Sequence, residues 1–220
     1  EIVSTVRQFV DKEIIPNAQD LEHSDTYPQA IVDQMREMGL FGLMVPEEYG
    51  GLGESLLTYA LCVEELARGW MSISGVINTH FIVAYMIRQH GTDEQKRRFL
   101  PRMATGETRG AFSMSEPELG SDVAAIRTRA RDNGDGTFTL NGGKAWITNA
   151  GVAELYTVMA VTDPGGRRGA NVTAFVVEKS DPGFGFGEKE RKLGIKGSPT
   201  RELLFDNCTI PEDRMVGARG

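Results

Sequence analysis

The stretch GAFSMSEPELGSDVAAIRTRARDNGDGTFTLNGGKAWITNAG, residues 110–151, decides how the second half of the chain folds. Apolar and polar residues alternate along much of it, a period of two that is typical of strands with one buried face. The alternation predicts strands over residues 111–115, 123–131, 137–141 and 144–149. A polar loop over residues 116–122 separates the first two strands, and Asn133-Gly134-Asp135-Gly136 forms a hairpin turn.

The last of these strands carries a pair of side chains suited to binding. Its alternation places Trp146 and Thr148 on one face, and Ala145 and Ile147 on the other. A large flat ring beside a hydroxyl, both facing one way, suits a planar heteroaromatic ligand. A tryptophan in a strand is also a common core residue, so both interpretations stay open at this point.

The loop before it, Glu116-Pro117-Glu118-Leu119-Gly120-Ser121-Asp122, has residues suited to a phosphate or pyrophosphate. Gly120 allows close approach of the backbone, and Ser121 supplies a hydroxyl. The same Gly-Ser-Asp order is ordinary turn chemistry as well. Glu116 is a candidate catalytic base by residue type, but the sequence gives no apolar pocket around it. We therefore interpret Glu116 as a carboxylate that stabilises the turn.

The composition is that of a globular protein with a sizeable core. The 220 residues are 40% hydrophobic and 25% charged, enough for one large domain or two modest ones. A net charge of −7 argues against a general nucleic-acid binder. No run of about 18 apolar residues offers a membrane span, and no secretory leader opens the chain. Cys62 and Cys208 form no metal or redox motif, so we expect reduced thiols in an intracellular protein.

The first half of the chain has the pattern of helices. An apolar stripe over residues 2–14 predicts an opening helix that Pro16 stops. Ser55 is a candidate N-terminal cap, and Thr92-Asp93-Glu94-Gln95 is a capping box. Residues 72–90 are apolar on nearly every side, which indicates a central, buried helix.

The period changes from helical to alternating at Thr105-Gly106. We therefore expect an N-terminal α-helical domain over residues 1–107 and a β-domain over residues 108–220. Further strands are expected over 154–162, 171–179 and 202–208, with loops over 163–170 and 182–187. A run of helices followed by seven or so short strands predicts an α+β fold whose second domain is a small β-barrel or sandwich.

The histidines and three alternating arginines give little evidence of a functional site. The three histidines show no metal-ligand spacing, so we expect no metal site. His80 lies in the buried helix and His90 at its end, and we interpret both as hydrogen-bonded core residues. Arg127, Arg129 and Arg131 alternate with uncharged residues. We interpret them as the solvated face of a strand rather than as a phosphate clamp.

Three motifs occur together and in order: Ser115-Glu116-Pro117, then Gly120-Ser121-Asp122, then Trp146-Ile147-Thr148-Asn149 after a short hairpin. In this combination they resemble the flavin-binding segment of the acyl-CoA dehydrogenase family, with its T/S-E-P-x-x-G-S-D and W-I-T-N motifs. The resemblance extends over essentially all 220 residues. It implies the N-terminal helical and middle β-domains of that family, with FAD bound to the β-domain.

The resemblance also assigns roles to individual residues. The cofactor-binding residues that it implies are Phe112, Met114, Ser115, Gly120, Ser121, Trp146, Ile147 and Thr148. Trp146 would cover the isoalloxazine, Thr148 would hydrogen-bond close to its N5, and Ser115 would bond the pyrimidine side. Ser121 would meet the FAD pyrophosphate and lie near the substrate, while Ser198 would approach the CoA moiety.

One departure concerns the loop itself. Many members of the family have a small residue where Glu118 lies, and Leu119 replaces a common Ala. If the family's loop needs a residue with positive φ here, this loop must bend differently.

The activity implied is the oxidation of an acyl-CoA to the trans-2-enoyl-CoA, by abstraction of the α-proton and transfer of the β-hydride to FAD. In the family the base is a Glu of a C-terminal helical domain, and no Glu of this chain matches it. We therefore expect no catalytic base in this chain and no dehydrogenase activity from it alone. The implied partners are an acyl-CoA, an electron-transfer flavoprotein or similar acceptor, and further copies in a dimer or tetramer.

Two alternatives remain open. The first is a related flavoenzyme on the same scaffold, an acyl-CoA oxidase or a flavin monooxygenase. The second is a non-catalytic subunit that keeps the fold, against which the intact set of hydroxyls around Trp146 argues. The resemblance places the protein in the cytoplasm of a bacterium or in the mitochondrial matrix of a eukaryote.

Overall fold

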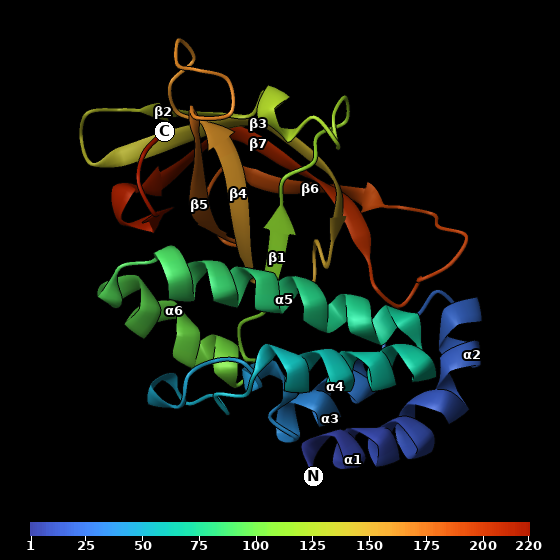
Figure 1. Ribbon diagram of the computed structural model, residues 1–220. Helices are drawn as coiled ribbons and strands as arrows, with labels where there is room; N and C mark the ends of the chain where they lie inside the picture. Colours follow the sequence, from blue (N-terminus) through green and yellow to red (C-terminus); the bar gives the residue numbers. More distant parts are fainter.

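The computed structural model describes residues 1–220, and its helices all precede its strands (Figure 1). The α-helices are α1 (Ile2–Phe9), α2 (Ile15–His23), α3 (Gln29–Glu37), α4 (Leu56–Gly69), α5 (Met71–His90) and α6 (Asp93–Ala104). The strands are β1 (Gly110–Ser113), β2 (Arg129–Asp132), β3 (Thr137–Thr148), β4 (Leu155–Val161), β5 (Val172–Glu178), β6 (Phe184–Lys189), β7 (Thr200–Pro211) and β8 (Met215–Val216). No helix is long and apolar enough to cross a bilayer.

Two helix starts follow the capping signals of the sequence. The Ser55 hydroxyl accepts a hydrogen bond from the Thr58 N–H at the start of α4. At the start of α6 the Thr92 hydroxyl accepts from the Gln95 N–H, and the Gln95 side chain accepts from the Thr92 N–H. Each bond satisfies a backbone donor that the first turn of a helix leaves unpaired. Both predicted caps are confirmed.

The prediction that Pro16 stops the opening helix is wrong. A π-helical turn, Val10–Ile14, continues α1 directly into α2, and Pro16 lies in the first turn of α2. A proline is tolerated there because a first-turn residue needs no N–H for an intrahelical bond. The wider π turn gives the ring the room that a continuous α-helix would deny it.

The strands form one mixed sheet in the order β6-β7-β3-β2-β4-β5-β8, with β1 paired to β4 outside this path. The expected α+β fold is confirmed, but the sheet is not closed into a barrel, because its end strands β6 and β8 do not pair with each other. One edge of β4 serves two partners: β1 runs parallel to its first half, and β2 meets it only where Arg129 pairs with Val161.

The predictions for four segments of the β-domain need correction. Only the end of the expected strand over 123–131 is extended, since Val123–Ala125 is a 3-10 turn and β2 begins at Arg129. The expected strands over 137–141 and 144–149 are one strand, β3, which continues through Gly142 by means of bulges. The expected loop over 182–187 contains β6, which pairs with β7 because its alternate Phe residues pack on the sheet's core.

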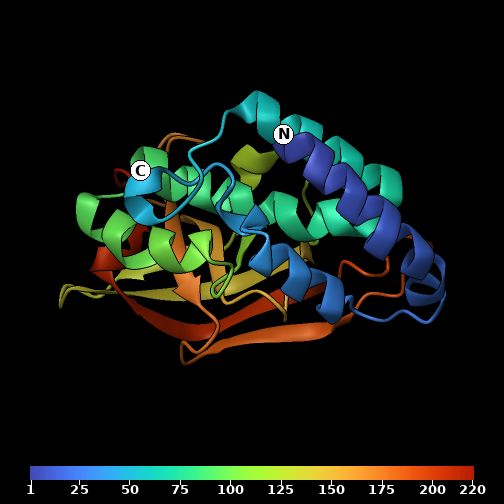
Figure 2. The same cartoon turned by 90° about the horizontal axis from the view of Figure 1, so that it is seen from below.

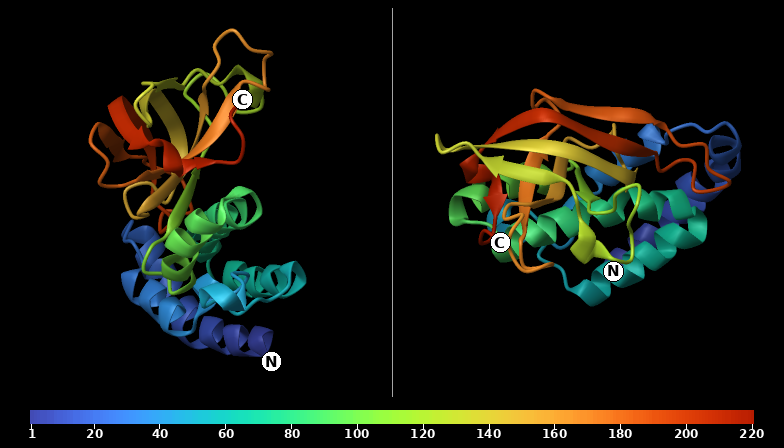
Figure 3. Two further views of the ribbon diagram at one scale, coloured as in Figure 1. Left: turned by 90° about the vertical axis from the view of Figure 1, so that its left-hand side faces the viewer. Right: turned by 90° about the horizontal axis from the view of Figure 1, so that it is seen from above.

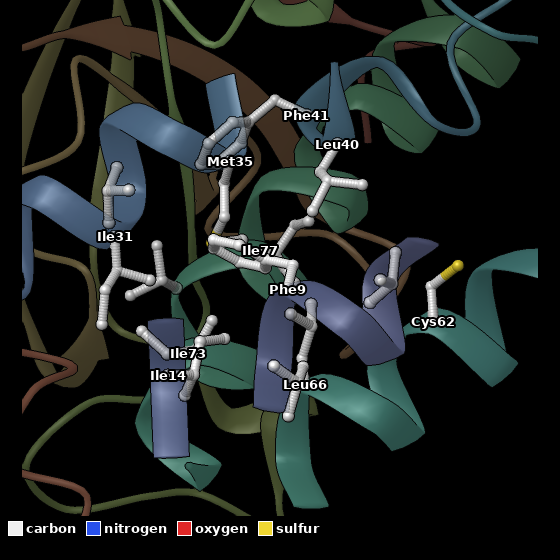
Figure 4. Packing of buried hydrophobic residues seen from close by; sticks show 14 of the residues in the cluster. Phe9, Ile14, Ile31, Met35, Leu40, Phe41, Cys62, Leu66, Ile73 and Ile77 are labelled. Carbon is white, nitrogen blue, oxygen red and sulfur yellow. The ribbon is translucent and has the colours of Figure 1, made fainter. Parts of the chain in front are cut away.

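Helix α5 lies between the other helices and the sheet (Figures 1 and 2). On its helical side, an 18-residue cluster joins it to α1, α3 and α4, as Figure 4 shows for Phe9, Met35, Leu66 and Ile77. On its sheet side, a second cluster joins α5 and α6 to β4 and β5. The predicted central, buried helix is therefore confirmed, and both domains pack on it.

Polar groups fix α5 to the first strand. The Gly110 N–H donates to His80 Nδ1 at 3.3 Å, and the Thr79 hydroxyl donates to the Gly110 carbonyl at 3.2 Å. A side chain at Gly110 would place its Cβ 2.6 Å from the Cβ of Val83, so only glycine allows this approach. His80 Nε2 lies 3.0 Å from the Phe41 carbonyl, and the predicted core role of this histidine is confirmed. The same prediction is wrong for His90, which is exposed at the end of α5.

Burial lowers the pKa of His80 from 6.5 to about 4. The folded pKa lies below the unfolded one, so the unfolded chain binds an extra proton between these values. The contribution of the neutral His80 to the free energy of unfolding is fully present above pH 6.5 and is lost as the pH falls toward 4. Between pH 7.5 and 4.5, we expect the free energy of unfolding of the native chain to fall by about 2 to 3 kcal/mol more than that of H80Q.

Denaturant unfolding at a series of pH values measures this difference. H90Q is the matched control, since His90 is exposed at the end of α5, and it should follow the native chain. A parallel fall for the native chain and H80Q would contradict the assignment.

Candidate functional site

The Trp146 side chain stands on the open face of β3. It is 59% exposed and Thr148 is half-buried, whereas Ala145 and Ile147 are buried beneath them. The two faces are those that the alternation predicts. An exposed indole contributes little to the core of this chain, so the ring is free to pack against something else.

The backbone of Trp146 is also unusual. Its φ is +56°, in the left-handed region that bulky side chains rarely adopt. The residue lies at a bulge, where the pairing of β3 with β7 shifts between Lys144 and Ile147. Bulges re-aim side chains, and strained φ values persist only where the surroundings impose them. The fold therefore keeps a strained, exposed tryptophan at this place.

Asn149, the last residue of the Trp-Ile-Thr-Asn motif, ties the site to helix α5. Its φ is +67°, and its buried side chain donates hydrogen bonds to the Gly75 and Val76 carbonyls and to the Thr79 hydroxyl. Its N–H donates to the Pro199 carbonyl at 2.7 Å. This structural role of Asn149 is not predicted from the sequence, although Asn is the non-glycine residue that most readily adopts positive φ.

The segment after β1 meets the same strand. Phe112, Met114 and Ser115 are half-buried, and the Ser115 carbonyl accepts a hydrogen bond from the Ala145 N–H at 3.0 Å. Ser115 thus lies against the residue that precedes Trp146. The structure therefore brings Met114 and Ser115 next to the two residues that immediately precede Trp146.

Gly120 and Ser121 lie on an exposed loop beyond this segment. A Cβ added to Gly120 would meet no atom of the chain within 4 Å, so the space next to its backbone is open. Neither Glu118 nor Leu119 has positive φ, and the loop is closed instead by reciprocal backbone bonds between Glu116 and Leu119. The loop therefore forms without the small residue that the family pattern has.

Glu116 has the structural role that the sequence suggests. It is buried, and it accepts hydrogen bonds from the Arg127 and Thr128 N–H groups, the Thr128 hydroxyl and Lys144 Nζ. Burial acts to raise the pKa of Glu116, but these donors outweigh it and lower the pKa. A carboxylate held ionised by four donors is a poor general base. Arg127, Arg129 and Arg131 point outward, as expected.

Ser198, the residue predicted to approach the CoA moiety, is fully buried. Its side chain has no exposed surface and its hydroxyl has no hydrogen-bond partner within the chain. It packs against α5, where a Cβ added to Gly75 would lie 2.9 Å from the Ser198 hydroxyl. In this structure Ser198 is therefore covered by the helix.

A cavity of about 630 Å³ contains none of the predicted cofactor residues. It lies in the helical half, between α4, α5 and the preceding loop, and its lining is mainly apolar, with Tyr59, Phe81 and Tyr85 among its residues. Of the predicted flavin residues, Trp146, Gly120 and Ser121 are exposed, whereas Ile147 is buried on the other face of β3. No group of three or more His, Cys, Asp or Glu side chains is arranged to hold a metal ion.

The fold and the order of its two halves define a class of protein. Residues 1–107 match the family model described as "Acyl-CoA dehydrogenase, N-terminal domain", and residues 111–208 match "Acyl-CoA dehydrogenase, middle domain". The chain therefore belongs to the acyl-CoA dehydrogenase family.

Individual relatives agree with this assignment. An acyl-CoA dehydrogenase of Bacillus subtilis is 42% identical over 217 residues, which cover 98% of this chain and 56% of the relative. The solved butyryl-CoA dehydrogenase of Megasphaera elsdenii superposes with a TM-score of 0.95 at 36% identity, over 100% of this chain and 58% of that one. An acyl-CoA dehydrogenase from Bacillus anthracis, solved in complex with FAD, gives a TM-score of 0.91 at 33% identity, over 99% of this chain and 38% of that one. The chain thus spans little more than half of the curated relative.

Asn149 contributes to stability in two ways, through its side-chain hydrogen bonds to α5 and through its tolerance of positive φ. We expect N149A to lower the free energy of unfolding by about 2 to 3 kcal/mol, because it removes the side-chain hydrogen bonds to α5 and places Ala at positive φ. N149G should recover about 1 kcal/mol of this loss, since glycine relieves the backbone strain without restoring the bonds. Denaturant unfolding of the three proteins measures both terms, and equal stabilities for N149A and N149G would rule out the backbone contribution.

Proposed function

We propose that this chain is the FAD-binding part of an acyl-CoA dehydrogenase, with Trp146 as the residue on which the flavin ring rests. The observation that supports this is an indole kept exposed at φ +56° beside the half-buried Thr148. The family membership supplies the chemical class. The residues also fit the group sterically, because Gly120 offers open backbone and Ser121 an exposed hydroxyl for a pyrophosphate.

In this proposal the named residues bind and orient the two ligands. Phe112 of β1 lines the flavin together with Met114 and Ser115 of the segment after it, and the buried Ile147 supports the strand below Trp146. Thr148 donates or accepts a hydrogen bond at the ring, and Ser121 lies between the cofactor and the acyl-CoA. Bound FAD supplies the acceptor for the hydride, while the protein contributes orientation and exclusion of water.

The reaction also needs a carboxylate that accepts the α-proton. Glu116 is excluded as that base, since its oxygens are buried and already accept hydrogen bonds from Thr128 and Lys144. We propose that the base comes from a further domain or another chain, and that this chain alone does not turn over substrate. Ser198 reaches the CoA moiety only if its loop moves away from α5.

The physiological partners follow from the same proposal. The substrate is an acyl-CoA, the electron acceptor is an electron-transfer flavoprotein or a similar carrier, and the full-length protein is a dimer or tetramer acting in fatty-acid metabolism. Cys62 and Cys208 are buried free thiols, which agrees with an intracellular, reducing location.

A flavin spectrum of the full-length protein tests the proposal. We expect the purified protein to show the visible absorption bands of oxidised FAD and to lose them when an acyl-CoA is added without oxygen. A series of acyl-CoAs of graded length then defines the substrate. A protein without flavin, and with no affinity for added FAD, would overturn the proposal. Rapid reoxidation of the reduced flavin by oxygen would favour an oxidase or monooxygenase, and bound FAD without bleaching a non-catalytic subunit.

Trp146 offers a sharper test at one residue. We expect W146A to weaken FAD binding by about tenfold or more, since loss of aromatic stacking and of the buried ring area removes about 1 to 3 kcal/mol. W146F keeps a ring and should stay within a few-fold of the native affinity. Titration of the apoprotein, followed by quenching of flavin fluorescence, measures both constants. Equal affinities for W146A and the native protein would show that the ring does not contact the cofactor.

A further inference from the structure

A buried ion pair lies directly under the proposed flavin site. Lys144 precedes Trp146 by two residues on β3, and its side chain has no exposed surface. Its Nζ donates to Glu116 Oε1 at 2.9 Å and to the Met114 carbonyl at 3.1 Å. Glu116 is itself 4% exposed. Both charges are therefore removed from water and satisfied by each other and by backbone groups.

The pair connects segments that are distant in sequence. The Glu116 carboxylate accepts from the Thr128 hydroxyl at 2.6 Å and from the Thr128 and Arg127 N–H groups at 2.9 and 2.8 Å. Lys144 brings in β3, and Glu116 belongs to the loop that carries Ser121. One carboxylate thus joins the loop to the segment leading into β2 and to β3.

Lys144 and Ala145 together bind two successive carbonyls of the segment after β1. Lys144 Nζ binds the Met114 carbonyl, and the N–H of Ala145 binds the Ser115 carbonyl. The backbone around Ser115 is thereby fixed to the two residues that immediately precede Trp146. Its position relative to the indole does not depend on the exposed part of the loop.

We propose that Lys144 and Glu116 are positioning residues of the flavin site, which hold Ser115 and Trp146 in the mutual geometry that the cofactor needs. The inference rests on the proposed function, since it assigns the pair to that site. Neither residue touches the ligand, because both side chains are buried below the surface that carries the indole.

Stability alone does not explain the pair. A buried ion pair loses in desolvation much of what it gains in attraction, and apolar residues of similar volume often replace such pairs without loss of stability. What apolar residues cannot supply is the directed bond from Nζ to the Met114 carbonyl or the four-donor fixation of the carboxylate. The pair therefore adds geometry rather than net stability.

The test compares full-length K144M, E116Q and the double variant with the native protein. K144M keeps the length of the side chain and removes its charge and donors. We expect K144M and E116Q each to weaken FAD binding by about tenfold, equivalent to loss of one charge-assisted hydrogen bond, and to shift the visible spectrum of bound flavin. In the apoprotein, the Ala145 amide should exchange its hydrogen at least about tenfold faster, as expected when a bond of this strength no longer restrains the segment. The double variant should lose about as much affinity as one single variant, since both changes break one unit.

E118Q is the matched control. Glu118 lies in the same loop and pairs with Arg127, but both side chains are largely exposed. It should leave the FAD affinity, the spectrum and the exchange rate of Ala145 unchanged. If K144M does not fold, E116Q alone carries the comparison, since it keeps the shape of the side chain.

The outcomes separate this inference from the proposed function. A native protein that binds no FAD overturns both. A native protein that binds FAD, with E116Q and K144M matching its affinity and spectrum, overturns the positioning role and leaves the proposed function intact. Lower thermal stability of the variants with unchanged affinity and spectrum would assign the pair to folding alone, and would equally overturn the inference.

Discussion

The structure depends on the contact between helix α5 and the first strand. Gly110 has no side chain, and this allows β1 to approach Val83 of the helix so closely that the Gly110 backbone bonds directly to Thr79 and His80. Figure 3 shows the sheet standing on the helices across this contact. Helix α5 has apolar residues on nearly every side because it serves two cores at once, one among the helices and one against β4 and β5. The relative placement of the two halves of the chain therefore follows from a seam of packed and hydrogen-bonded atoms.

Thr79 connects this contact between α5 and β1 to the candidate site. Its hydroxyl donates to Gly110 and accepts from the Asn149 side chain, so one residue of α5 holds both the first strand and the end of β3. Trp146 lies three residues before Asn149, and both residues have positive φ. A strained segment of this kind keeps its shape only when it is fixed at its ends. Asn149 fixes one end to the helix, and Ala145 and Lys144 fix the other to the segment after β1.

The sequence predicts the elements whose signals are local. The capping pattern at Thr92, the apolar surface of α5 and the two faces of β3 each arise from neighbouring residues, and each is present in the structure. The errors arise where the backbone departs from the usual local rules or where a strand depends on a partner. Pro16 ends a helix by local rules, but a π turn accommodates it, and the Phe-Gly pattern of β6 becomes a strand only because β7 lies alongside. Closure of the sheet could not be read from strand count, since it depends on whether the two end strands, β6 and β8, pair with each other.

The candidate site likewise has features that local sequence predicts and features that depend on distant residues. An indole and a hydroxyl at positions two apart in a strand can be recognised from the residues alone, whereas the partner of Lys144 lies 28 residues away and becomes evident only in three dimensions. A lysine between Gly143 and Ala145 has the appearance of a solvated charge in the sequence, and its burial is decided by the return of the Glu116 loop over it. Once buried, it requires a counter-charge and acceptors in fixed directions, because an unpaired ammonium in the interior is too costly to persist. The loop that would contact a pyrophosphate is thus constrained from below by an electrostatic requirement, while its outer residues, Gly120 and Ser121, stay free to meet a ligand.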